Sequence, residues 1–355
     1  MGCAESKPAG GASEPLPVEA KYWKEWLANP ENMRDLSGKQ VLITGVSTAA
    51  SLGFFVTEAL ALKGARCTIT CRNRDKGQTV KEALETKLKE SGVWTEIEVM
   101  SMDNCKFSSV RDFCTAFKEK HDRLDIVVNN AGVMALPYEL TEDGYDVQIQ
   151  TNHLSHFLMT ALLWPLIKKT AEESPVYITQ VSSALSEIGS PTIPTNDLNT
   201  KHPSHGFPLY LFFMIGGGSN DMWARYGSSK LANAVFSQEL HRRIEKAGLA
   251  QSIVSTASHP GFASTNLQVS SQKAGGVRNA RGQQKQAQAA EDGALPLIMA
   301  VAGPDSKGGE WFGPKDHMKG PPIKTQNKNP QTYKEEIGAA LWDLSEKAVG
   351  LKFEV

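Results

Sequence analysis

A tyrosine and a lysine four residues apart, in the string YGSSK (residues 226–230), are the pair best suited to proton transfer in this chain. On a helix, residues four apart lie on one face. A free phenol with a pKa of about 10 exchanges protons poorly at neutral pH. An ammonium about 4 Å away, at an effective dielectric constant of about 20, would stabilise the phenolate by roughly 4 kcal/mol, or about 3 pKa units before desolvation opposes it. Tyr226 and Lys230 therefore predict a phenol acid/base, although an ordinary helix pair also fits the spacing.

A second chemical signal is the string VLITGVSTAASLGFF, residues 41–55. An apolar run ends at Gly45 and a helical pattern begins near Gly53. Such glycines let the backbone approach the pyrophosphate of a dinucleotide, and the helix N-terminus supplies N–H groups. The glycine expected between them is replaced by Ala49 or Ala50. We expect a working phosphate-binding turn with altered geometry, while a ligand-free strand-to-helix turn stays open. Three hydroxyl groups can assist: Ser47, Thr48 and Ser51.

The end of the next strand-like run, RCTITCRNR, indicates which nicotinamide cofactor this turn would hold. NAD-binding sites commonly place a carboxylate there for the ribose 2′-hydroxyl. Here Cys71 stands at that place, followed by Arg72 and Arg74, with no carboxylate. A guanidinium can bind a 2′-phosphate through two hydrogen bonds. The sequence therefore favours NADP(H) over NAD, with a solvated basic turn as the alternative.

Apolar strand-like runs alternate with helical patterns from Gln40 onward. Runs rich in Val and Ile are typical of buried parallel strands. Alternation of this kind predicts an α/β fold with right-handed crossovers, that is, a Rossmann-type doubly wound parallel sheet. The predicted strands are QVLITG, RCTITCR, EIEVMSMD, LDIVVNNAG, PVYITQVSS and SIVSTASHPG.

The remaining segments define the domain organisation. Residues 1–20 are rich in Ala, Gly, Pro, Ser and Glu and are predicted to be a disordered leader. Residues 21–37 are predicted to be a helical extension that packs through Trp23 and Trp26. Residues 38–350 form the single α/β domain. Insertions that would form a lid over the substrate are expected at about 184–225 and 262–290, where the alternation breaks.

Composition excludes several classes of protein. The net charge of −1 implies no general attraction to nucleic acid. The chain has no run of about 20 apolar residues, so we expect no membrane-spanning helix. The five cysteines form no CxxC pair and are expected to be free thiols in a reducing compartment. We expect no metal site, because His153 and His156 lack a third partner.

Motifs spread along the chain together resemble the short-chain dehydrogenase/reductase family. NNAG (129–132), YGSSK (226–230) and HPG (259–261) follow the glycine turn in the family's order, and the resemblance covers about residues 38–350. The strings CRNRDKG, YGSSKLAN, GGEWFGP and ALWDLSEKAVGLKF are similar to the retinol-dehydrogenase-like branch. Protochlorophyllide reductases are also similar, but they use a cysteine in the catalytic half, and no cysteine follows Cys114 here.

The resemblance implies a role for each motif residue. Tyr226 is the acid/base supported by Lys230, and Ser183 polarises the substrate carbonyl, with Ser182 as second choice. Asn152 holds a water that links Lys230 to solvent. The implied cofactor contacts are Gly45, Ser47, Thr48, Leu52, Gly53, Arg72, Asp103, Asn129, Ala131, Gly132, Tyr226, Lys230, Pro260, Gly261 and Thr265.

Two of these cofactor contacts have plain alternatives. Asp103 resembles the family's adenine-contacting aspartate, but it also fits an exposed loop residue. Thr265 matches a position that contacts the carboxamide or a phosphate, but it also fits a helix N-cap. Asn129 and Gly132 are expected behind the cofactor, where they would stabilise the central sheet.

The function implied is an NADP(H)-dependent oxidoreductase that interconverts a carbonyl and an alcohol on a lipophilic substrate such as a retinoid or steroid. Apolar residues beside glycines at 207–218 suit a lid over that substrate, and they equally fit an oligomer contact or core packing. A protochlorophyllide-type double-bond reductase and a non-catalytic NADPH-binding scaffold are the alternatives. A homodimer stays open.

The N-terminal string MGCAESK fits the myristoylation pattern at Gly2, with Ser6 in the required place. One myristoyl chain binds membranes marginally, with an association constant of about 10⁴ M⁻¹. Cys3 could carry a second acyl chain. We expect an acyl-anchored enzyme on the cytoplasmic face of a membrane, or a cytoplasmic one if the leader is unmodified.

Overall fold

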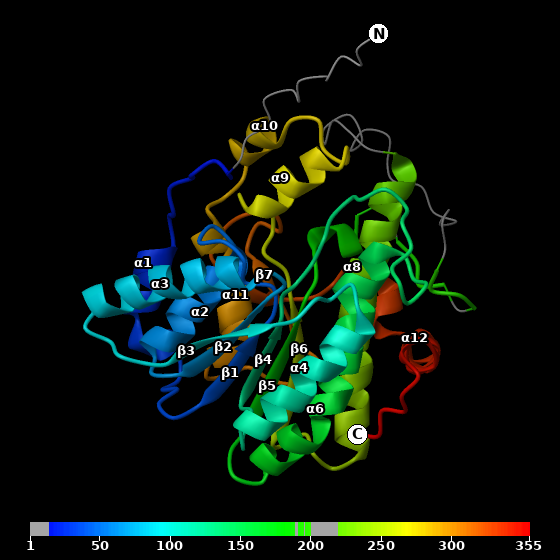
Figure 1. The fold of residues 1–355 in the computed structure, drawn as a ribbon, viewed down its shortest axis with the longest axis horizontal. Coiled ribbons are helices and arrows are strands. Elements are labelled where there is room, and N and C mark those ends of the chain that lie inside the picture. Colours follow the sequence, from blue (N-terminus) through cyan, green and yellow to red (C-terminus); the bar gives the residue numbers. More distant parts are fainter. Residues whose placement is uncertain (1–13, 189–190, 195, 200–218) are drawn as a thin grey trace.

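Seven strands of one sheet run parallel, and an eighth closes its edge in the opposite direction. The computed structural model describes residues 14–188, 191–194, 196–199 and 219–355 (Figure 1). The strand order is β3-β2-β1-β4-β5-β6-β7-β8, with only β8 antiparallel. The strands are β1 Gln40–Ile43, β2 Arg66–Cys71, β3 Ile97–Ser101, β4 Ile126–Asn129, β5 Val176–Val181, β6 Ile253–Ser258, β7 Trp311–Pro314 and β8 Pro322–Thr325. The doubly wound parallel sheet is therefore confirmed, and β1 to β6 match the predicted strands.

Helices cover both faces of the sheet (Figure 1). One layer contains α2, α3 and α11, and the other contains α4, α6 and α8, with α12 against α8. The α-helices are α1 Trp23–Ala28, α2 Leu52–Leu62, α3 Arg74–Glu90, α4 Phe107–Lys120, α5 Val147–Ile149, α6 Ser155–Ala171, α8 Asn220–Lys246, α9 Asn266–Lys273, α10 Ala280–Gln284, α11 Ala290–Ala302 and α12 Glu335–Val349. Short 3-10 turns are η1 Pro30–Asn32, η3 Ala184–Ser186 and η4 Pro330–Tyr333, and η2 Gln150–Leu154 is a π-helical segment.

The C-terminal helix is held by aromatic packing. Trp342 is fully buried and stacks on Phe353 with ring centroids 4.8 Å apart, and its edge meets Phe157 of α6 at 5.2 Å. Aromatic side chains contribute large apolar areas, so such a cluster anchors the helix firmly. Helix α12 thus closes the layer formed by α4, α6 and α8.

The strand order determines where a ligand can bind. Strand β1 pairs with β2 on one side and with β4 on the other, so the order of the chain reverses there. In open α/β sheets, ligands bind in the crevice beyond the carboxyl ends of the strands at such a reversal. The glycine turn follows β1, Arg72 follows β2, Ser183 lies two residues beyond β5, and Pro260 two beyond β6.

The segment before the sheet is tied to α11 through one buried carboxylate. Asp292 accepts hydrogen bonds from the N–H groups of Lys21, Tyr22 and Trp23, at 2.8, 3.0 and 3.0 Å. These are free N–H groups at the start of α1, where a negative charge is stabilising. The ring of Trp23 also packs on Phe55, with centroids 5.7 Å apart.

Part of the predicted leader is held against the domain. Residues 14–20 are described, and the N–H of Leu16 donates to Gln284 Oε1 at 2.9 Å, while its carbonyl accepts from Ser264 Oγ at 2.7 Å. This differs from a leader that is loose over all of residues 1–20.

Other expectations lie outside the described residues. They are acylation at Gly2 and Cys3 and the apolar lid at 207–218. Among the residues that the structure describes, no helix has the length and apolar character to cross a membrane.

Candidate active site

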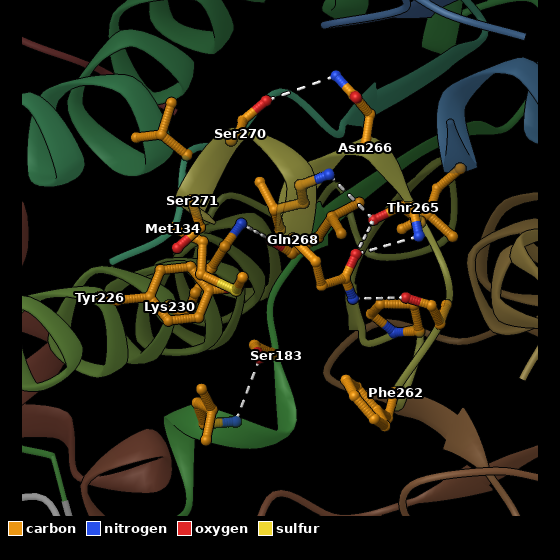
Figure 2. Close-up of a pocket in the computed structure, with 18 of the residues that line it drawn as sticks. Met134, Ser183, Tyr226, Lys230, Phe262, Thr265, Asn266, Gln268, Ser270 and Ser271 are labelled. Carbon is orange, nitrogen blue, oxygen red and sulfur yellow. Dashed lines mark hydrogen bonds between the residues drawn. The ribbon is translucent and has the colours of Figure 1, made fainter. Parts of the chain in front are cut away.

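A cavity of about 1390 Å³ lies over the carboxyl ends of the strands. Ligand pockets are usually about 300–1,000 Å³, so this cavity has room for more than one molecule. Figure 2 shows Tyr226 and Lys230 on one side of it and Thr265 and Phe262 on the other. The predicted site residues that line it are Gly45, Ser47, Thr48, Leu52, Arg72, Gly132, Ser183, Tyr226, Lys230, Pro260, Gly261 and Thr265.

The glycine turn forms without strain at the alanines. Gly45 has φ +73°, and a Cβ added there would lie 2.6 Å from the Cα of Ala131. Only glycine accommodates both conditions readily. Neither Ala49 nor Ala50 has a positive φ, so the longer loop needs no middle glycine.

Gly53 serves packing rather than ligand contact, because it does not line the cavity. A Cβ at this position would lie 2.8 Å from Asn130 Nδ2 and 2.9 Å from Val46 Cγ2. The glycine therefore lets α2 approach the turn closely. Ser51 caps that helix by accepting from the N–H of Phe54 at 3.2 Å.

Two features of the turn suit a phosphate. The hydroxyl oxygen of Thr48 is buried, lines the cavity and has no hydrogen-bond partner among the described residues. The N-terminus of α2 also meets the cavity, through Ser51 and Leu52. Unpaired donors at a helix N-terminus form an anion-binding site.

Substituting Gly45 should cost more stability than substituting a glycine of similar backbone conformation in open space. Gly144 has φ +85° and nothing within 4 Å of an added Cβ. Gly45→Ala and Gly144→Ala share the backbone strain, but only the former collides with Ala131. We expect Gly45→Ala to lose about 1–3 kcal/mol more in urea unfolding, the usual cost of overpacking. Equal losses would mean that the Ala131 segment yields freely.

Ser183 and Tyr226 form the centre of the site. The Ser183 side chain interacts with the phenol of Tyr226, and its hydroxyl accepts a hydrogen bond from the N–H of Leu185 at 3.2 Å. Tyr226 is 3% exposed and packs edge-on against Trp223, with centroids 6.3 Å apart. Lys230, one turn along α8, donates from Nζ to the carbonyl of Val181 at 2.9 Å.

Similarity to known proteins shows the family to which this chain belongs. The sequence model of a protein family described as short chain dehydrogenase matches residues 39–195. Retinol dehydrogenase 14 of Mus musculus is 32% identical over 349 residues, which cover 92% of this chain and 94% of that protein. This chain belongs to the short-chain dehydrogenase/reductase family. The relative places it in the retinol-dehydrogenase-like branch of these oxidoreductases.

Two further proteins are similar to this short-chain dehydrogenase. An uncharacterized oxidoreductase of Schizosaccharomyces pombe is 37% identical over 247 residues, covering 68% of this chain and 65% of that protein. A putative short chain dehydrogenase from Escherichia coli, solved as a complex with NADPH, has a TM-score of 0.55 and 20% identity over 79% of this chain and 97% of that one. The latter likeness supports the fold.

The phenol of Tyr226 does not have the lowered pKa that its spacing from Lys230 predicts. Burial raises the pKa of Tyr226 to about 12, and the interaction with Ser183 opposes the rise only in part. Burial also lowers the pKa of Lys230 to about 7, so its charge at neutral pH is incomplete. The lowered phenol pKa expected from the spacing is therefore not found in this structure, because desolvation of the buried phenol dominates.

Asn152 lies in the π-helical segment η2. Its Oδ1 accepts from the N–H of Val133 at 2.8 Å, and its Nδ2 donates to the carbonyl of Val133 at 3.0 Å and to Ser229 Oγ at 2.8 Å. A Cβ at Gly132 would lie 3.1 Å from Lys230 Nζ and 3.2 Å from Asn152 Oδ1. Gly132 thus leaves the space in which these two polar groups meet. Such π segments frequently occur at functional sites.

Four other predicted residues do not make the contact that the sequence predicted for them. Asn129 and Ala131 do not line the cavity: Asn129 Nδ2 donates to Gln180 Oε1 at 3.0 Å, within the sheet. Asp103 does not line it either, and its Oδ1 accepts from the N–H of Cys105 at 3.0 Å. Ser182 lines it, but its hydroxyl donates to the carbonyl of Lys230 at 2.6 Å.

The two helix histidines are structural. His156 Nε2 is hydrogen-bonded to Thr44 Oγ1 at 2.8 Å, and His153 Nε2 to Ser345 Oγ at 2.8 Å. Burial lowers the pKa of His153 to about 3 and that of His156 to about 4. Both rings are therefore neutral at physiological pH.

The sequence did not identify most of the individual residues that form one wall of the cavity. The segment 262–290 forms α9 and α10 there, beyond one end of the sheet (Figures 1 and 2). Thr265 caps α9 and forms a capping box with Gln268, a Thr-x-x-Gln signature that could have identified this helix start. The lining residues not predicted from this segment include Phe262, Asn266, Leu267, Gln268, Ser270, Ser271, Arg278 and Asn279.

Proposed function

We propose that this short-chain dehydrogenase is an NADP(H)-dependent oxidoreductase that interconverts a carbonyl and an alcohol on a lipophilic substrate of the retinoid or steroid type. One observation carries the proposal. Ser183 and Tyr226 line the same cavity as the glycine turn and Arg72.

The residues around the turn fit a dinucleotide phosphate. The unpartnered hydroxyl of Thr48 and the N-terminus of α2 would hold the pyrophosphate. Arg72 is exposed at the cavity and carries no carboxylate neighbour in sequence, so it would pair with the 2′-phosphate. The fold neighbour solved with NADPH is consistent with this choice.

The nicotinamide supplies or accepts the hydride when it is bound. Tyr226 transfers the proton to or from the substrate oxygen, and Ser183 donates a hydrogen bond to that oxygen. A pKa of about 12 keeps the phenol protonated at neutral pH, which is the form that carbonyl reduction needs. Lys230 at the cavity wall and Asn152 behind it act as positioning residues, through Val181 and Val133.

The apolar part of the cavity wall favours a lipophilic substrate. Ligand pockets of this kind are mostly apolar, with a few polar groups that orient the ligand. The relative's name, retinol dehydrogenase 14, points to the same class. The apolar lining residues beside the Ser183–Tyr226 pair include Met134, Leu136, Leu185, Ile188, Trp223 and Phe262.

The experiment is a fluorescence titration with NADPH and NADH, followed by NADPH oxidation with retinal, steroid ketones and quinones. We expect micromolar binding of NADPH. Arg72→Gln should weaken NADPH binding about 10- to 100-fold, because a charged hydrogen-bond pair contributes about 1.5–3 kcal/mol, and should leave NADH binding unchanged. Arg74→Gln is the matched control, since Arg74 begins α3 and does not line the cavity.

The outcomes separate the alternatives. Absence of NADPH binding at micromolar concentration would support a non-catalytic scaffold and contradict the proposal. Binding without reduction of any carbonyl, together with reduction of a carbon–carbon double bond, would support the protochlorophyllide-type reaction.

A further inference from the structure

Three metal-ligating side chains meet beside the cavity, although no metal site is expected from the sequence. Glu187 directly follows η3, His259 directly follows β6, and His317 lies in the turn between β7 and β8. One potential ligand atom from each lies within 4.8 Å of the other two. The residues come from three separate loops, so the cluster arises only in the folded chain.

Within the part of the chain that the structure describes, the carboxylate of Glu187 is buried without a hydrogen-bond donor in contact with it. Its side chain is 4% exposed, and both oxygens are buried with no hydrogen-bond partner among the described residues. The nearest ionisable nitrogen is Nε2 of His317, at 3.8 Å, and Lys328 attracts the carboxylate through its backbone and its charge without an ion-pair contact. An unpaired buried carboxylate is costly unless it is paired or coordinates a metal. The side chain therefore indicates a missing partner at this place.

The two histidines are held in place for a ligand. His259 is buried and stacks on Trp311, with centroids 5.4 Å apart. Its Nδ1 accepts from the N–H of Gly261 at 3.3 Å, and a metal bound at either ring nitrogen would replace this hydrogen bond. Its ring centroid is 5.4 Å from that of His317. His317 has φ +64°, a backbone conformation that is uncommon for residues other than glycine. Fixed neutral imidazoles of this kind are common metal ligands.

We propose that Glu187, His259 and His317 bind one divalent transition-metal ion of the zinc type. Two imidazoles and one carboxylate suit Zn²⁺, whereas Ca²⁺ and Mg²⁺ prefer all-oxygen sites. Bond lengths of about 2.0–2.2 Å require the ligand atoms to approach one another by roughly 1 Å. Three protein ligands leave the fourth position to water.

The position of the cluster assigns the ion a structural role at the cavity wall. Glu187 is four residues beyond Ser183, and His259 directly precedes Pro260. His317 precedes Met318, whose carbonyl accepts from the N–H of Phe262 at 2.7 Å. The ion would therefore join the serine segment, the loop after β6 and the β7–β8 turn. It would not touch the reacting atoms.

The test uses the tag-free full chain, because affinity tags of histidine bind zinc themselves. The protein is stripped with a chelator, dialysed and titrated with Zn²⁺ against a chromophoric competitor. We expect one ion per chain. Co²⁺ should give the visible absorption of a four-coordinate nitrogen–oxygen site, and the bound ion should raise the Tm.

Two conservative variants address the ligands. Glu187→Gln keeps the shape of the side chain, and His317→Asn keeps a residue that tolerates positive φ. Each should weaken Zn²⁺ binding by more than about 100-fold, beyond the loss from removing an outer-shell partner. His241→Asn is the matched control, because His241 lies 3.6 Å from Glu245 without a third ligand and should bind as the wild type does.

Three results would overturn the proposal. They are absence of stoichiometric metal uptake by the wild type, equal affinities in all variants, and a near-ultraviolet thiolate band of Co²⁺, which would assign the metal to cysteine. Neither metal uptake nor the Co²⁺ spectrum depends on NADPH or turnover. Failure here would therefore leave the proposed oxidoreductase function untouched.

Discussion

Tyr226→Phe should reduce turnover by about 10²–10⁴-fold, the usual contribution of a positioned acid/base. The phenol is the only proton donor proposed for the substrate oxygen, and Tyr226 lines the cavity together with Ser183. The substitution removes one oxygen and keeps the ring, so its packing against Trp223 remains. The measurement is NADPH oxidation with the best substrate of the screen, together with an NADPH fluorescence titration.

The binding result decides what a loss of turnover means. NADPH affinity should stay within a few-fold of wild type, because the phenol oxygen is assigned to proton transfer. Tyr177→Phe is the control, since this half-buried tyrosine on β5 stacks under Arg34, 3.7 Å from the guanidinium carbon, and does not line the cavity. Wild-type turnover in Tyr226→Phe would assign the proton transfer to another group.

The second large effect is expected on stability in mild acid. His153 and His156 have pKa values of about 3 and 4 in the folded protein, against about 6.5 for an ordinary histidine. The unfolded chain therefore binds more protons below pH 6.5, and stability falls as the pH falls toward 4. At pH 5 each histidine costs about 2 kcal/mol relative to pH 7.5, together about 4 kcal/mol. This is a large share of a typical stability of about 5–15 kcal/mol.

Two other groups nearly cancel in this pH range. His259, with a pKa of about 3, acts in the same direction as the helix histidines. Glu187, with a pKa raised to about 7, acts in the opposite direction, because the folded protein then binds the proton first. Lys230, with a folded pKa of about 7 against an ordinary value of 10.5, makes stability rise with pH mainly between these two values.

The measurement is urea unfolding at pH 7.5, 6 and 5 in the presence of a chelator. His153→Asn should lower stability at pH 7.5 and reduce the loss between pH 7.5 and 5 by about half. A stability that does not change over this range would show that the two rings accept protons in the folded state.

Most of the fold was predictable because buried parallel strands have a plain sequence pattern. The Val- and Ile-rich runs identify β1 to β6, whereas β7 and β8 escape notice. Strand β7 is the four residues WFGP, and β8 exposes Lys324 and Thr325, so neither has the long apolar run of a central strand. Their pairing depends on tertiary contacts.

The site was predictable in membership and less so in energetics. Family motifs identify Ser183, Tyr226 and Lys230, and all three line the cavity. The sign of the pKa change in Tyr226 depends on burial, which a spacing of four residues does not reveal. The Glu187–His259–His317 cluster spans three distant segments, so no local spacing could indicate it.

The hydrogen bonds of Leu16 make the region before the sheet a part of the cavity's outer support. Ser264 precedes the cap of α9, and Gln284 ends α10 and donates to the carbonyl of Thr265 at 3.0 Å. Leu16 is therefore linked by hydrogen bonds to the cavity wall that α9 and α10 form. A group attached ahead of Leu16, whether a lipid or a fusion partner, would therefore be joined through these bonds to the wall of the cavity that holds Tyr226.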